Sequence, residues 1–125
     1  MTSPEAHPDK FYVIVRSNMP PGLQMAQATH AAIQFGQEWP DLLAPWYTDS
    51  NFLVIVGAPD EDALMQMADY ANELGIRYSI VEEPDLHDSV TAIALQPGEV
   101  ARMLCACSPL ALREAEEPEI EYATP

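Results

Sequence analysis

Polar residues that could do chemistry gather in three stretches of the sequence. One is a turn that begins at Arg16, the second is a helix face carrying Gln27 and His30, and the third is the acidic loop 82–89 with Glu83. An imidazole beside a carboxylate can transfer a proton, and a guanidinium can hold an anion. We therefore expect His30 and Glu83 to form a proton-transfer pair in a cleft that also contains Arg16.

Simpler interpretations remain open for the same residues. His30 can be an exposed helix histidine without a function, and the loop 82–89 can be a solvated acidic loop or, less simply, a divalent-cation site. The sequence contains no glycine-rich phosphate loop, nucleophile elbow, zinc signature or basic stretch with interleaved aromatics. We therefore expect neither a metal ion nor a cofactor.

Hydrophobic patterning predicts an α/β fold in which strands alternate with helices. Runs of β-branched and aromatic residues predict buried strands, and helical spacing of apolar residues predicts the helices between them. Loops at the carboxyl ends of parallel strands converge in such sheets, which places the turn after Arg16 and the loop 82–89 at one edge. The predicted strands are 11–16, 52–56, 77–81 and 90–95; the predicted helices are 23–39, 60–74 and 99–107, with a short amphipathic turn at 41–47.

Spacing at 100° per residue predicts which side of each helix faces the core. Asp60 is the expected N-cap of the second helix, and Gly75 its end. Cys105 and Cys107 are expected to be small buried residues and not a metal or redox site. The predicted inward residues are Met25, Ala28, Ala32, Phe35 and Trp39; then Leu64, Met67, Ala68, Ala71 and Leu74; then Val100, Met103 and Leu104. Gln24, Gln27, His30, Gln34 and Glu38 are predicted on the opposite side of the first helix.

Charge limits the partners that this chain can bind. Twenty acidic residues against five basic ones give a net charge of −15. Because nucleic-acid affinity comes mainly from lysine and arginine on phosphates, we expect weak nucleic-acid binding. Solubility, or adaptation to high salt, explains such charge equally well.

The composition fits one domain. We expect a single α/β domain at 10–112 between a disordered segment at 1–9 and a disordered acidic tail at 113–125. The N-terminal residues lack the pattern of a signal peptide, and no apolar run is long enough to cross a membrane, so we expect a cytoplasmic protein.

Four segments together resemble the type II peptidyl-tRNA hydrolase family. They are Phe11–Ser17, Ala26–Ala31 with the pattern Ala-Gln-x-x-His-Ala, Phe52–Ala71 with Ala-Pro-Asp-Glu at Ala58–Glu61, and Thr91–Pro97, and the likeness extends over about residues 10–112. The resemblance implies a small mixed sheet of about four strands sandwiched between helices, hydrolysis of the ester joining a peptide to tRNA, and a homodimer. It also implies catalytic roles for His30, Glu83 and Ser89, and substrate-binding roles for Arg16, Gln27 and Thr91.

The sequence departs from the family pattern where charge matters most. The family's lysine-rich stretch after the first strand is shortened here to Arg16–Leu23 and contains no lysine, and its Asp-Ala-Gly-x-Thr segment is replaced by Glu83–His87. Loss of one preorganised catalytic charge typically slows an enzyme about 10²–10³-fold, so weak activity on ordinary peptidyl-tRNA is expected.

Three functions remain open on the sequence. The first is a divergent hydrolase of an aminoacyl or peptidyl ester, in which Glu83 assists a water and His30 or Arg16 orients the substrate. The second is an inactive relative that binds a small molecule or a protein. The third is a structural dimer without a ligand.

Overall fold

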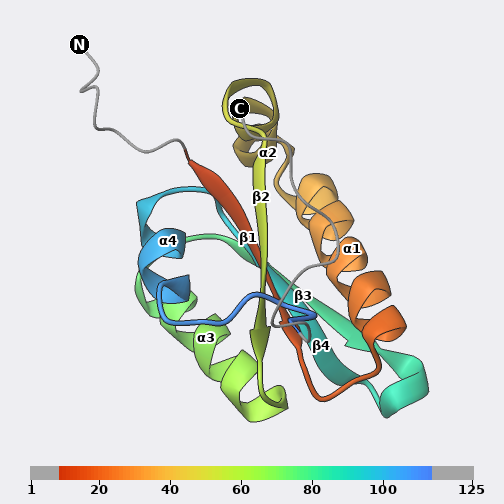
Figure 1. Ribbon diagram of the computed structural model, residues 1–125. Coiled ribbons are helices and arrows are strands. Elements are labelled where there is room, and N and C mark those ends of the chain that lie inside the picture. The colour runs from red at the N-terminus through yellow and green to blue at the C-terminus, as the bar shows by residue number, and fades with distance from the viewer. Residues whose placement is uncertain (1–8, 114–125) are drawn as a thin grey trace, which may run out of the picture.

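The computed structural model describes residues 9–113, which form a four-stranded mixed sheet with helices on both faces (Figure 1). The strand order is β2-β1-β4-β3; β1 runs parallel to β2, and β4 runs antiparallel to both β1 and β3. The predicted mixed sheet between helices is therefore confirmed. The strands are β1 (Lys10–Arg16), β2 (Phe52–Ala58), β3 (Tyr78–Glu83) and β4 (Ser89–Leu95).

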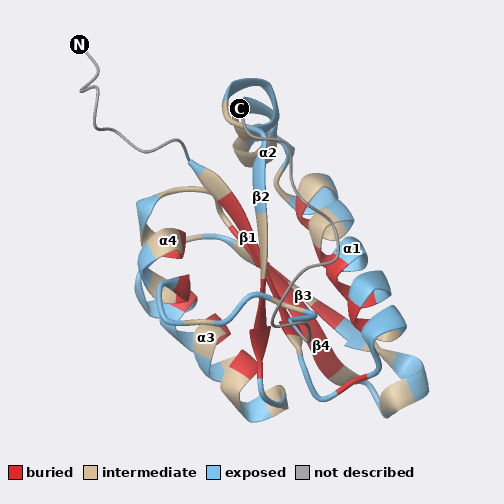
Figure 2. Cartoon of the chain, viewed as in Figure 1, coloured by how far each residue is buried: buried red, intermediate tan, exposed pale blue. Residues whose placement is uncertain are grey.

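Two apolar layers hold the helices on the sheet. Side chains alternate along β1, so that Phe11, Val13 and Val15 pack under α1 and α2, while Tyr12 and Ile14 pack under α3 and α4. Figure 2 shows buried residues concentrated on the strands and on the inner sides of the helices. The helices are α1 (Pro21–Glu38), α2 (Pro40–Asp49), α3 (Glu61–Glu73) and α4 (Glu99–Cys105), with a 3-10 turn, η1 (Pro84–Leu86), between β3 and β4.

The predicted inner face of α1 was partly wrong. Ala28 and Phe35 are buried as expected, but Met25 is 59% exposed, and Gln24 and Gln27 are buried. The helix is rotated from the apolar stripe because both glutamine amides donate hydrogen bonds, Gln24 to the turn after β1 and Gln27 to Glu83 at the end of β3. Gln34 and Glu38, which were predicted to point away, also reach β3, through the Ile80 carbonyl and the Ser79 hydroxyl.

Two other helices differ in detail from the prediction. Leu74 is 54% exposed at the end of α3, and Met103 is 63% exposed on α4, where Ala101 and Cys105 face the core instead. Helix α4 ends at Cys105, so Cys107 is exposed and only Cys105 is the small buried residue that was expected. Burial raises the pKa of the Cys105 thiol to about 12, which keeps it protonated at neutral pH.

The segment 41–47 forms part of a full helix. Helix α2 begins with Pro40 at its first turn and contains Pro45, while Leu42 and Trp46 pack partly buried against the α1 side of the core, as predicted. The predicted disordered ends, at 1–8 and 114–125, lie outside the described residues. No helix within residues 9–113 has the length and apolar character to cross a bilayer.

Asp60 caps α3, as the sequence predicts. Its Oδ1 accepts a hydrogen bond of 2.9 Å from the Ala63 amide. We expect Asp60→Ala to lower the free energy of unfolding by about 1 kcal/mol, because the amide loses its acceptor. Asp62→Ala is the matched control: it removes an exposed carboxylate from the same turn without removing the cap. Equal urea midpoints for the two variants would contradict this role.

Candidate active site

The carboxyl ends of β1, β2 and β3 meet the start of β4 at one edge of the sheet. There the Arg16 guanidinium donates through Nη1 to the Ser89 hydroxyl at 3.2 Å and to the Val90 carbonyl at 3.4 Å. Its Nε donates to Asn18 Oδ1 at 3.0 Å, so the next turn of the chain also holds it. Ser89 is paired with Glu83 in the β3–β4 register. The predicted approach of the turn after β1 and the loop after β3 is therefore confirmed.

A β-bulge aims Thr91 at α1. Along β4, Ile93 packs on the α3 side and Ala92 on the α1 side, so regular alternation would turn Thr91 towards α3. The register shifts by one residue, however, with Val81 opposite Ala92 and Glu82 opposite Val90. Thr91 is the extra residue, and its side chain faces α1. Bulges commonly re-aim a side chain in this way beside functional sites.

The Gln27 side chain joins Thr91 to Glu83 in one hydrogen-bonded chain. Thr91 Oγ1 donates to Gln27 Oε1 at 2.5 Å, and Gln27 Nε2 donates to Glu83 Oε1 at 2.9 Å. Both Thr91 and Gln27 are buried, with 0% and 3% of their surface exposed, whereas Glu83 is half-buried. Because a buried amide with both ends paired has one orientation, this chain fixes the Glu83 carboxylate at the sheet edge.

The other carboxylate oxygen of Glu83 accepts a hydrogen bond from the loop that follows β3. Glu83 Oε2 accepts from the Asp85 amide at 3.4 Å, and the Glu83 carbonyl accepts from the Asp88 amide at 3.0 Å. His87 and Asp88 both have φ near +57°, a left-handed conformation that histidine and aspartate adopt more readily than most residues. The loop thus closes tightly enough to return the chain into β4 at Ser89.

His30 stands apart from this cluster. It lies three residues beyond Gln27, about 60° further round the helix from the core, and its side chain is exposed. Glu83 is bonded to Gln27 instead, and the His30 side chain forms no hydrogen bond within residues 9–113. The expected proton-transfer pair of His30 and Glu83 is therefore wrong. The other five predicted site residues do gather at this edge.

Sequence reasoning missed two residues that support the site. The Glu61 carboxylate accepts from the Val90 amide at 2.6 Å, which ties the start of α3 to the bulge. Gln24 Nε2 donates to the Met19 carbonyl at 2.7 Å and holds the turn after Arg16. Glu61 belongs to the Ala58–Glu61 segment of the family resemblance, which was a usable signal; nothing in the spacing marks Gln24.

The basic residues of the chain are distributed unevenly. Lys10 and Arg77 stack on the rings of Phe52 and Trp39, at the other end of the sheet, and Arg102 pairs with Glu99 at 2.6 Å. Arg16 and Arg113 are the remaining two, and Arg113 lines a pocket of about 270 Å³ together with Ser17, Gln24, Gly57 and residues 109–112. Two cations thus flank the edge where the site residues meet.

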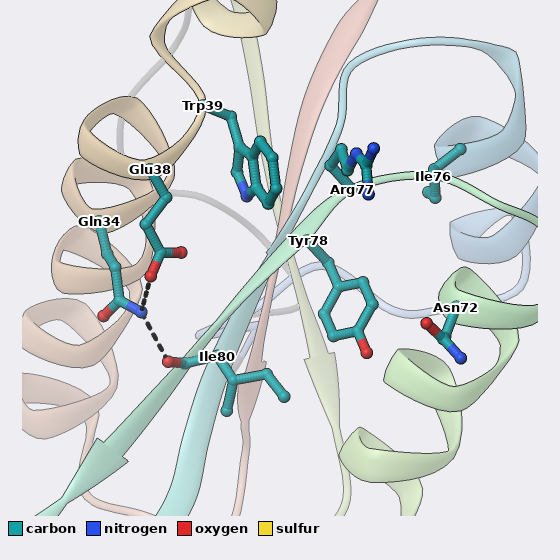
Figure 3. A pocket seen from close by; sticks show the side chains of 8 residues that line it. All are labelled: Gln34, Glu38, Trp39, Asn72, Ile76, Arg77, Tyr78 and Ile80. Carbon is teal, nitrogen blue, oxygen red and sulfur yellow. Dashed lines mark hydrogen bonds between the residues drawn. The ribbon is translucent and has the colours of Figure 1, made fainter.

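A second, wider pocket lies elsewhere. It opens at the start of β3, and Figure 3 shows Trp39, Arg77 and Tyr78 around it. On the α1 side of the pocket, Gln34 Nε2 donates a hydrogen bond of 2.8 Å to the Ile80 carbonyl. None of the six predicted site residues lines it.

Within residues 9–113, no group of three or more His, Cys, Asp or Glu side chains could hold a metal ion.

Thr91→Val tests the hydrogen-bonded chain. The substitution keeps the shape but removes the hydroxyl that donates to Gln27, which leaves the amide oxygen buried and unpaired. We expect a loss of about 1–3 kcal/mol in the free energy of unfolding, measured in urea. Thr91→Ser keeps the hydroxyl and should lose less. If Thr91→Val proved the more stable of the two, the hydrogen bond would not support the site.

Comparison with known proteins identifies the family. The family model described as "Peptidyl-tRNA hydrolase PTH2" matches residues 10–110. The mouse protein named "Peptidyl-tRNA hydrolase 2, mitochondrial" is 32% identical over 101 residues, which cover 73% of this chain and 56% of that protein; its human counterpart is 29% identical over 99 residues, covering 71% and 55%. The chain spans about half the length of these relatives.

A solved structure supports the fold alone. It is a protein of unknown function from Agrobacterium tumefaciens, which matches with a TM-score of 0.61 at 13% identity, over 84% of this chain and 98% of that one. The family match covers most of the chain and includes every element that builds the sheet edge. This chain therefore belongs to the peptidyl-tRNA hydrolase PTH2 family.

Proposed function

We propose that this sheet edge hydrolyses the ester between an aminoacyl or peptidyl group and tRNA. The observation that carries the proposal is the buried Gln27 amide, which binds Thr91 at one end and the half-buried Glu83 carboxylate at the other. A carboxylate held in one orientation beside a cation is what water activation at an ester requires. The family's name supports the choice of substrate.

Each residue of the edge has a part in the proposed reaction. The Glu83 carboxylate accepts a proton from water while the water oxygen attacks the ester carbonyl carbon. The bond from that carbon to the ribose oxygen breaks, and the ribose oxygen leaves with a proton, which yields a free acid and tRNA. Arg16 and Ser89 lie close enough together to stabilise the negative charge on the carbonyl oxygen or a nearby phosphate.

The remaining residues act less directly. Gln27 and Thr91 are too deeply buried to contact a substrate, so we propose that they position the Glu83 carboxylate. His30 is exposed on α1, three residues beyond Gln27, and we assign it to contact with the substrate and not to proton transfer with Glu83. The chain has no lysine in the turn after β1 to assist Arg16, so we expect slow turnover of ordinary peptidyl-tRNA.

Location and assembly are part of the proposal. We propose a cytoplasmic homodimer, although the mouse, cattle and human relatives are named as mitochondrial proteins. Cell fractionation and sedimentation of the purified protein test these two points independently of activity.

Glu83→Gln tests the proposed general base. The amide keeps the shape and still accepts from Gln27, but it cannot take a proton from water. We expect kcat on N-acetyl-aminoacyl-tRNA to fall about 10²-fold or more, with KM little changed. Glu82→Gln, which alters the neighbouring exposed carboxylate, should behave as wild type. Equal activity of both variants would contradict the assignment, and an inactive wild-type protein would favour the binding-module alternative.

The acidic surface predicts an unusual salt dependence. Enzymes that bind tRNA through six to ten phosphate contacts lose about 10³–10⁵ in affinity between 50 and 200 mM salt. A chain with a net charge of −15 repels tRNA, and salt screens this repulsion, so we expect KM to stay constant or to fall over that range. Steady-state kinetics in increasing KCl measure it. A KM that rises more than tenfold would mean that an unrecognised basic surface binds the RNA.

A further inference from the structure

Two adjoining cavities beside the proposed active site share Gln24 and the segment 111–112. The wider one, of about 270 Å³, is lined by the polar side chains of Ser17, Gln24 and Arg113, together with Gly57 and the segment 109–112. The smaller one, of about 120 Å³, is lined almost entirely by apolar side chains: Val15, Met25, Ala28, Ile55, Ala111 and Leu112. An apolar cavity of about 150 Å³ is large enough to bind benzene, so the smaller cavity matches one aliphatic side chain.

Gln24 presents a hydrogen-bond acceptor that the protein leaves unused. Its side chain is only 6% exposed, and its Nε2 donates to the carbonyls of Met19 at 2.7 Å and Ser17 at 3.3 Å. Two carbonyl partners fix the amide orientation, because only the NH₂ group can donate to them. Gln24 Oε1 cannot take part in these bonds, so it is buried without a donor in residues 9–113, on a side chain that lines both cavities. Burying such an acceptor unpaired is unfavourable unless a ligand supplies the donor.

The segment 109–112 completes the cavities. It crosses the free edge of β2, where the Gly57 amide donates to the Pro109 carbonyl at 2.9 Å and the Ala111 amide donates to the Ile55 carbonyl at 3.0 Å. This pairing holds Ala111 and Leu112 over the apolar cavity. Met25 and Leu112 are exposed apolar side chains at its rim, a surface that favours an apolar ligand.

We propose that these cavities form an acyl-binding subsite that selects an aliphatic side chain. The side chain of the acyl residue fills the apolar cavity, and its amide N–H donates to Gln24 Oε1. The ester then points along the turn after β1, towards Arg16, and Arg113 lies beside the anionic end of the substrate. This subsite rests on the proposed function, which it deepens by naming the preferred acyl group.

Binding of small methyl esters tests the subsite without requiring turnover. The probes are N-acetyl-leucine methyl ester, N-acetyl-glycine methyl ester and methyl 4-methylpentanoate, titrated into the labelled protein and followed by amide chemical shifts. The leucine ester should shift residues 24–28, 55 and 111–112 and bind at least about tenfold tighter than the glycine ester, which buries no side chain. The pentanoate lacks the N–H and should bind about tenfold more weakly than the leucine ester.

A cavity-filling variant supplies the second test. Ala111→Leu fills the apolar cavity and should weaken leucine-ester binding at least about tenfold, while the melting temperature stays the same or rises. Ala106→Leu, at an exposed position outside the cavity, is the matched control and should bind as wild type. The probe series on the unmodified chain remains decisive if Ala111→Leu does not fold.

The outcomes separate the subsite from the hydrolase activity. Equal binding of the three probes, shifts confined to the wider pocket at the start of β3, or no shifts up to the solubility limit would each overturn the subsite even if tRNA esters are hydrolysed. Leucine-selective binding at Gln24 without any hydrolysis would leave the subsite standing and remove the proposed function instead.

Discussion

The buried Gln27 amide is the constraint on which the rest of the site depends. An amide with both ends inside the protein must find a donor for its oxygen and an acceptor for its nitrogen. Thr91 and Glu83 are those partners, and they lie on two strands, 64 and 56 residues after Gln27 in the sequence. The rotation of α1, the bulge in β4 and the orientation of Glu83 are therefore consequences of one requirement.

The strands and the helix starts were the predictable part of this fold. Short runs rich in β-branched and aromatic residues mark the four strands, and Asp60 marks the start of α3, because these signals are local and depend on backbone preferences. The inner face of α1 was not predictable in the same way. Periodicity treats Gln24 and Gln27 as polar and turns them outward, whereas in the structure they are buried and satisfied by groups distant in the sequence. Spacing alone cannot show such partners.

The bulge explains why the sequence could predict which residues lie at the site but not how their side chains are oriented. Strand alternation assigns Thr91 to the α3 side, and only the shift of register between Val81 and Glu82 brings it to Gln27. His30 shows the converse error. A histidine near a carboxylate in a plausible cleft suggests a pair, but the carboxylate is already bonded and the histidine lies further round the helix. Three of the five residues that gather at the site, Arg16, Gln27 and Thr91, lie in the segments that carry the family resemblance.

The central claim is that Gln27 acts on catalysis only by positioning Glu83, and a double-mutant cycle tests it most directly. The measurement is kcat on N-acetyl-aminoacyl-tRNA for wild type, Gln27→Leu, Glu83→Gln and the double variant, each shown to be folded by its amide spectrum. Since one residue acts through the other, Gln27→Leu should lower kcat in the wild-type background and have no further effect once Glu83 is replaced. Two losses that multiply in the double variant would show that Gln27 and Glu83 act independently, and would contradict the account.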